Sequence, residues 1–218
     1  MKTPQKKTLL YKLIIYLSPK VKKLLKKILY IPKNQTDNEF STQVFIFFVV
    51  LVLGIRFLAK APSPEDPYGA SDSFLHNINL VFHEAGHILF IPFGEFLTIL
   101  GGSLFQCLVP FICMYYFLIK SNNFSASITF WWFGQNLMDI APYIYDAKAL
   151  YLPLLTGAQG EAKKLSHDWY LLLTKMDILD QYSNLALFVN NLGRLCLVLS
   201  LIWSAYLLFK TNKLLAKK

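Results

Sequence analysis

Two histidines and a glutamate stand close together in residues 82–90, which read FHEAGHILF. His83 and His87 are four residues apart, so in a helix they project from one face, one turn apart, with Glu84 beside them. Two imidazole nitrogens at this spacing can bind one Zn²⁺ at about 2.0–2.1 Å, while the glutamate stays outside the coordination sphere and takes a proton from water. The pattern His-Glu-x-x-His therefore predicts a zinc site with Glu84 as its acid/base.

The chain around this motif has the composition of a membrane protein. Of its 218 residues, 55% are hydrophobic and only 16% are charged, and the mean hydropathy is +0.40. Ionisable side chains in a bilayer are costly unless they are paired, and they usually mark functional sites. The alternative is a buried cluster of hydrogen-bonded histidine and glutamate that holds helices together. That alternative explains the polarity of the motif but not its spacing.

A catalytic zinc usually has three protein ligands and one open position, so a third ligand must come from elsewhere in the chain. The best source is residues 131–148, WWFGQNLMDIAPYIYDAK. A polar stripe runs down one side of this predicted helix, with offsets of three, four and three: Asn136, Asp139, Tyr143 and Asp146. We expect this stripe to face a partner inside the protein, and the metal is a natural partner. Pro142 should bend or unwind the helix near its end.

A hydrophobic His-Glu-x-x-His segment, followed by a membrane helix with an Asn, a Pro and an Asp, resembles the site-2 protease family of intramembrane zinc metalloproteases. The resemblance covers about residues 77–148. Asn136 and Pro142 resemble two members of the family's second motif. The resemblance implies a zinc-dependent peptidase with these functional residues: His83, His87 and Asp146 as zinc ligands, and Glu84 as the catalytic acid/base.

The sequence departs from the family's second motif, Asn-x-x-Pro-x-x-x-x-Asp-Gly. The Asn and the Asp are ten residues apart here, and Ala147 stands at the position of the glycine. Two other residues therefore remain candidates for the third ligand besides Asp146. Asp139 lies on the same polar stripe, and His167 lies in a polar segment that could fold back over the site. The pair His167-Asp168 has two further interpretations, either a carboxylate that orients an imidazole or a helix cap.

Five charge-poor apolar segments approach or exceed the length of about 20 residues that a membrane-spanning helix needs. They are Phe40–Ala59, Ile78–Phe93, Phe96–Ile119, Ser125–Ile144 and Leu185–Phe209. Pro92, Gly94 and the pair Gly101-Gly102 interrupt the second and third segments, as in a re-entrant hairpin. With four true spans, both ends of the chain would lie on the same side. We therefore predict an all-α, polytopic membrane bundle of four to five transmembrane helices.

A basic arm is expected to precede this bundle in residues 1–39. Residues 1–33 hold ten lysines and no acidic residue, whereas the rest of the chain has 12 basic and 13 acidic residues. Lysines alternate with apolar residues at helical spacing in Lys6–Leu17 and Pro19–Tyr30, and Ser18-Pro19 is typical of a helix start. The arm should lie on the membrane surface and keep the N-terminus in the cytoplasm. Anionic lipids are a further candidate partner, whereas nucleic acid is not expected.

The membrane domain is expected to cover residues 40–210, with a polar loop at 149–184 and a basic tail at 211–218. Residues 60–73 should form a polar, turn-rich loop, and Ser166-His167-Asp168-Trp169 should open a helix. Three cysteines lie in apolar segments, where we expect packing without disulfides or metal: Cys107, Cys113 and Cys196. A secretory signal peptide is not expected, because lysines break the first apolar run.

The predicted function is an intramembrane zinc metalloprotease that hydrolyses peptide bonds in or near the membrane segments of a membrane-protein substrate. The expected location is the cell (inner) membrane. Two alternatives stay open. One is a non-enzymatic metal-binding or transport-related membrane protein, and the other is a zinc hydrolase that acts on a non-peptide substrate.

Overall fold

A computed structural model describes residues 18–32, 34–63, 66 and 68–217. Within these residues the regular elements are helices, with no strand among them. The α-helices are α2 (Pro19–Ile28), α3 (Asp37–Leu58), α4 (Phe74–Phe90), α5 (Glu95–Ile119), α6 (Asn123–Asp146), α7 (Gly160–Ser166), α8 (Asp168–Lys175) and α9 (Tyr182–Leu215). Three short 3-10 helices join them, η1 (Gly69–Ser71), η2 (Ile91–Phe93) and η3 (Leu179–Gln181). The predicted helix Lys6–Leu17 lies outside the described residues.

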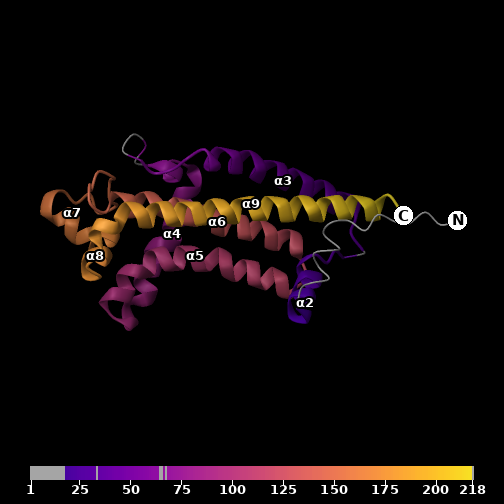
Figure 1. Cartoon of the computed structure of the whole chain (residues 1–218), viewed down its shortest axis with the longest axis horizontal. Coiled ribbons are helices and arrows are strands. Elements are labelled where there is room, and N and C mark those ends of the chain that lie inside the picture. Colours follow the sequence, from indigo (N-terminus) through magenta and orange to yellow (C-terminus); the bar gives the residue numbers. More distant parts are fainter. Residues whose placement is uncertain (1–17, 33, 64–65, 67, 218) are drawn as a thin grey trace.

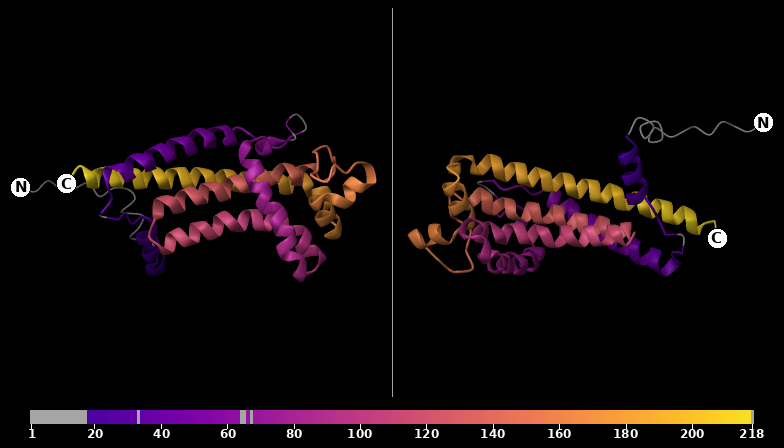
Figure 2. Two further views of the ribbon diagram at one scale, coloured as in Figure 1. Left: turned by 180° about the vertical axis from the view of Figure 1, so that it is seen from behind. Right: turned by 90° about the horizontal axis from the view of Figure 1, so that it is seen from below.

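The long helices α3, α5, α6 and α9 run along the longest axis of the molecule, as Figure 1 shows. In Figure 2 (left), the magenta α4 crosses this bundle near one end and meets α5 at a corner. Helix α6 packs against α9 and α5, and α4 packs against α5. The helix α2 and the C-terminus lie at one end of the bundle, whereas α7 and α8 lie at the other end.

Each of the five predicted apolar segments corresponds to a helix. Three helical stretches in the described part of the chain are long and apolar enough to cross a membrane: Asp37–Leu58, Glu95–Ile119 and Leu179–Leu215. Helix α6 has 24 residues and most of them are buried, so it lies inside the bundle and carries more polar side chains than its neighbours. Helix α4 has 17 residues and is about 25 Å long, which is shorter than a hydrocarbon core of about 30 Å.

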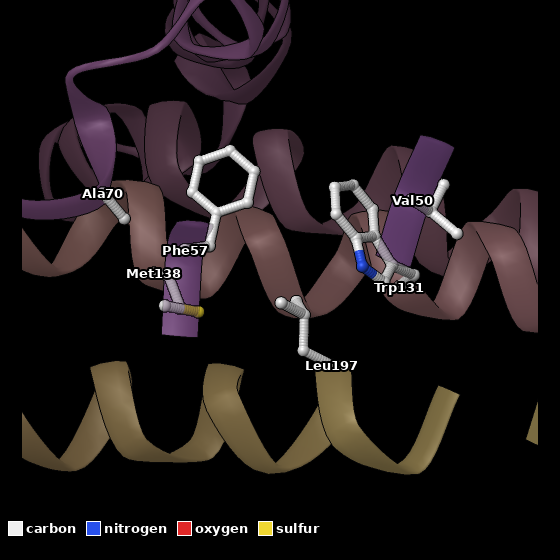
Figure 3. Close-up of a cluster of buried hydrophobic side chains, with 6 residues drawn as sticks. All are labelled: Val50, Phe57, Ala70, Trp131, Met138 and Leu197. Carbon is white, nitrogen blue, oxygen red and sulfur yellow. The ribbon is translucent and has the colours of Figure 1, made fainter. Parts of the chain in front are cut away.

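A hydrophobic cluster joins α3, η1, α6 and α9. Its buried members are Val50, Phe57, Ala70, Trp131, Met138 and Leu197. Figure 3 shows these side chains beside the ribbons of α3, α6 and α9. The rings of Phe57 and Trp131 lie 5.9 Å apart in a tilted arrangement, which is a favourable geometry for aromatic pairs. This cluster holds α6 firmly, and α6 in turn supplies one wall of the candidate site.

The helix α2 is fixed to the end of the bundle that lies away from α7 and α8. As Ser18-Pro19 predicted, Ser18 caps this helix, and its side chain accepts a hydrogen bond from Val21 N. Asn123 donates to Lys27 O and Tyr30 O at 2.7 and 2.8 Å, and Trp203 donates to Ile28 O at 2.9 Å. The lysine-rich α2 is therefore joined to the bundle near the start of α6 and the last third of α9.

Candidate functional site

The helix α4 brings His83, Glu84 and His87 together, as their spacing predicts. One ligand atom from each of the three lies within 4.8 Å of the others. The two imidazole rings meet edge to face, with centroids 4.9 Å apart. Both histidines are partly buried, whereas Glu84 is exposed. The motif thus forms one compact group with its carboxylate on the accessible side.

A tight hairpin packs this part of α4 against α5. Gly94 has φ +92 between the two helices, a backbone conformation that favours glycine. Further along, a Cβ on Gly101 would lie 2.8 Å from Gly86 O, so the two helix backbones are almost in contact. Gly102 follows directly, and a Cβ there would lie 2.6 Å from His83 Nε2 and 2.5 Å from His87 Nε2. The space beside the two Nε2 atoms therefore exists only because Gly102 has no side chain.

The other ring nitrogens are held by hydrogen bonds that orient both imidazoles. His87 Nδ1 lies 2.9 Å from Thr98 O, and a carbonyl oxygen can only accept, so Nδ1 carries the proton. His83 Nδ1 lies 3.1 Å from Gln106 Oε1, while Gln106 Nε2 donates to Asp139 Oδ2 at 2.9 Å. That second bond sets the orientation of the amide, so His83 Nδ1 donates as well. Both Nε2 atoms face the same space, and with Nδ1 protonated each ring could offer its Nε2 lone pair to a metal ion there, as metal-binding histidines do.

A carboxylate from a distant segment closes this space. Asp168, the first residue of α8, has its Oδ2 at 3.0 Å from His83 Nε2 and 3.2 Å from His87 Nε2. Ligand atoms bound to one zinc at about 2.0–2.1 Å in a tetrahedron are about 3.3 Å apart. Burial raises the pKa of Asp168, but hydrogen bonds from the protonated Nε2 atoms of the two histidines outweigh this effect and hold the pKa at about 2, and the same contact raises the pKa of His87 to about 9. The carboxylate is therefore anionic at neutral pH, as a zinc ligand must be. Zinc would replace the two Nε2 protons.

The residues that the sequence proposed as third ligands lie elsewhere. Asp146 is buried, and its two oxygens accept hydrogen bonds from Tyr151 N and Leu152 N. His167 is also buried, and its Nδ1 accepts from Tyr170 N, which makes it the N-cap of α8. The second interpretation of His167-Asp168, a helix cap, is thus confirmed for His167. We replace Asp146 by Asp168 as the candidate third ligand, because Asp168 contacts both Nε2 atoms.

Asp139 belongs to a buried polar network next to the motif. Its carboxylate accepts hydrogen bonds from Asn79 Nδ2 and Gln106 Nε2 at 3.0 and 2.9 Å, and lies 3.2 Å from His76 Nδ1. These contacts occupy the carboxylate with three partners, which is how a buried charge is stabilised. Asp139 thus acts on the motif through Gln106 and His83 and is not itself in the ligand group.

A cavity of about 630 Å³ adjoins the three candidate ligands and Glu84. It lies between α4, α5, α6 and the start of α8. Its apolar lining includes Leu80, Ile99, Ile140, Leu154 and Leu155. A cavity of this size, with mostly apolar walls and a few converging polar groups, is typical of a substrate-binding site.

Two functional contacts could not be found in the sequence. The Thr98 carbonyl that orients His87 is a backbone atom, and backbone atoms leave no residue-type signal. Asp168 has a signal, since it follows a histidine in a polar segment, but nothing in the spacing links it to a motif 85 residues away. Gln106 is a polar residue within the apolar segment Phe96–Ile119, but nothing in the sequence pairs it with His83. No family model matches this chain, and no curated protein or solved structure is significantly similar to it.

Proposed function

We propose that this protein is a zinc metallopeptidase of the membrane, with His83, His87 and Asp168 as metal ligands. The observation that carries the proposal is the convergence of two Nε2 atoms on one carboxylate oxygen, at 3.0 and 3.2 Å. Both Nδ1 atoms are already bonded to oxygen acceptors, so Nε2 is the atom of each ring that can bind the metal. This arrangement keeps the His-Glu-x-x-His half of the site-2 protease pattern and takes its third ligand from another segment.

Glu84 would act as the acid/base. When bound, zinc would supply a Lewis acid that polarises a carbonyl group and makes water more acidic. Glu84 is exposed and its carboxylate lies within 4.8 Å of the histidine ligand atoms, which is a distance that one water molecule can bridge. Glu84 would take a proton from that water as the water oxygen forms a bond to the carbonyl carbon, and it would pass this proton to the leaving amine as the C–N bond breaks. Glu84 would thus both accept and donate the transferred proton, and no further residue is needed for this step.

The proposed substrate is a peptide segment of a membrane protein. The cavity has room for several side chains, and its walls combine apolar residues of α4, α5 and α6 with the polar ligand group. Exposed apolar residues also lie on the outer face of α4 beside Glu84, namely Val81 and Ile88. In a bilayer this face would contact lipid or an apolar substrate segment. An apolar peptide near the membrane would therefore suit the site better than a soluble, charged one.

We also propose that α3, α5, α6 and α9 cross the membrane and that both chain ends lie in the cytoplasm. The five lysines of α2 and Lys210, Lys213 and Lys217 near the C-terminus gather at one end of the bundle. The positive-inside rule assigns this end to the cytoplasm. The site lies at the other end, beside α8, so it would face the non-cytoplasmic side. The N-terminal arm would then be an interfacial tether in contact with anionic lipid.

Labelling can test this orientation in intact cells. Single cysteines would be placed at Gln159 and Asn212, both exposed, after the three native cysteines are replaced by alanine. A membrane-impermeant maleimide should label position 159 in intact cells and position 212 only after the cells are opened. The reverse result would place the site in the cytoplasm and leave the metal proposal unaffected.

The metal and the activity are tested with four proteins purified in detergent. Wild type and Glu84→Gln should each contain about one zinc per chain, whereas His83→Ala and Asp168→Ala should not retain it. Cleavage of an apolar fluorogenic peptide by the wild type should be lost in Glu84→Gln. Zinc in all four proteins would refute the ligand assignment. Zinc with no cleavage of any peptide or ester would favour the non-enzymatic metal-binding protein, and ester cleavage alone would favour the non-peptide hydrolase.

A further inference from the structure

Asp146 is a buried carboxylate with a defined role in the chain turn after α6. Its exposed fraction is 2%. Oδ1 accepts from Tyr151 N at 2.6 Å and Oδ2 accepts from Leu152 N at 3.0 Å. Leu152 is itself buried. The carboxylate therefore fixes the segment that leaves α6 and starts the loop over the cavity.

His167 lies against the same carboxylate. It is 1% exposed, and its Nε2 is 3.4 Å from Asp146 Oδ2. This approach lacks hydrogen-bond geometry, and Nε2 has no hydrogen bond among the described residues. His167 Nδ1 accepts from Tyr170 N at 3.2 Å, so in the neutral ring the proton must be on Nε2. That proton lies near the negative charge of the Asp146 carboxylate, at an N–O distance of 3.4 Å, and this attraction favours the tautomer that caps α8.

The cap controls the position of the next residue. Asp168 is the first residue of α8 and directly follows His167. The rest of α8 is anchored by Leu172 and Leu173, both fully buried, and by a hydrogen bond from Trp169 Nε1 to Ser103 Oγ at 3.1 Å. These anchors hold the body of α8 against α5. The His167 cap is what sets the direction in which its first residue enters the site.

We infer that Asp146 and His167 are a positioning pair for the metal ligand Asp168. Asp146 would hold the His167 ring in its capping tautomer, and the cap would place the Asp168 carboxylate within reach of His83 and His87. The inference rests on the proposed zinc site. It gives the aspartate that resembles a family ligand a different role, namely orienting the segment that carries the ligand.

The expected loss of zinc affinity can be taken from other metal sites in which a residue that orients a ligand has been replaced. Loss of a residue that orients a ligand commonly reduces metal affinity about 10–100-fold. We expect this range for Asp146→Asn and for His167→Asn. In His167→Asn the shorter side chain can still cap a helix, but it would no longer reach Asp146. The second variant therefore separates the contact with Asp146 from capping alone, and it remains informative if Asp146→Asn does not fold.

The experiment measures Zn²⁺ affinity by competition with a chromophoric chelator and the visible spectrum of the Co²⁺-substituted protein. Both variants should bind Zn²⁺ about 10–100-fold more weakly than the wild type. Their Co²⁺ spectra should approach that of Asp168→Ala. The matched control is Asp180→Asn, which removes an exposed carboxylate that pairs with Lys148 and should leave both readouts unchanged.

Two results would overturn the inference. Zn²⁺ affinities within threefold of the wild type in both variants, with an unchanged Co²⁺ spectrum, would show that the pair does not position the ligand. Loss of zinc in Asp146→Asn with retention in Asp168→Ala would make Asp146 a ligand. Failure of the zinc site itself looks different, because His83→Ala would then bind Zn²⁺ as well as the wild type does.

Discussion

Replacement of Gly102 by alanine should abolish zinc binding without changing any ligand. A Cβ at this position would lie 2.5 Å from His87 Nε2 and 2.6 Å from His83 Nε2. Comfortable contact needs about 3.5 Å, so the two rings would have to move by about 1 Å. Ligand distances in metal sites tolerate only about 0.2 Å. One methyl group would therefore displace both Nε2 atoms beyond bonding range.

The rings cannot move freely, because each is held at its other nitrogen. A shift of His83 stretches its bond to Gln106 Oε1, and a shift of His87 stretches its bond to Thr98 O. Each such bond contributes about 1 kcal/mol net. We expect at least a 100-fold loss of Zn²⁺ affinity, which is about 2.8 kcal/mol. The helix itself should tolerate the change, since alanine favours an α-helix by about 1 kcal/mol over glycine.

The assay compares Zn²⁺ affinity and thermal unfolding of Gly102→Ala with those of a matched variant. Gly54→Ala makes the same substitution in α3, where the added Cβ would meet Trp131 Nε1 at 3.1 Å, away from the imidazoles. It should bind zinc like the wild type. If Gly102→Ala also binds zinc within threefold of the wild type, the space beside the two Nε2 atoms is not the metal position and the reasoning is wrong.

Three further results are expected. Gln106→Leu removes the acceptor of His83 Nδ1 and should weaken Zn²⁺ binding about 10–100-fold in a chelator competition, whereas unchanged affinity would exclude Gln106 as a positioning group. Trp169→Phe loses the bond to Ser103 Oγ and should lower the free energy of unfolding by about 1 kcal/mol in denaturant titration. Chelator treatment should lower the thermal midpoint of the wild type, because zinc at 100 times its Kd contributes about 2.7 kcal/mol, and added zinc should restore it. The control is His83→Ala, whose thermal midpoint should not change with chelator.

Helix prediction succeeded where the signal is local. Each apolar segment became a helix because a charge-poor run of this length satisfies its backbone polar groups most simply within a helix. The position of Ser18 as a cap and the helix start at His167 were likewise predictable from a few neighbouring residues. The same local logic placed His83, Glu84 and His87 on one face of α4.

His76 shows where local reasoning fails. Its place after the polar loop 60–73 predicts a solvated interfacial histidine, but its side chain is 19% exposed and its Nδ1 lies 3.2 Å from the buried Asp139. The difference arises because α4 crosses the bundle and brings its first turn against α6. The crossing angle of two helices depends on how their surfaces interdigitate, and a single segment does not contain that information.

The sequence by itself determined the membrane class, the helices and one half of the candidate site, since each of these depends on residues within one or two helical turns. It proposed Asp146 as the third ligand and left Asp139 and His167 open, and it did not point to Asp168, because the distance between two segments far apart in the chain is not recorded in either of them. Only the tertiary structure shows which carboxylate lies beside the two Nε2 atoms. Packing of Leu172 and Leu173 and the bond from Trp169 to Ser103 place α8 over α5, and this contact between distant segments brings Asp168 to the two histidines.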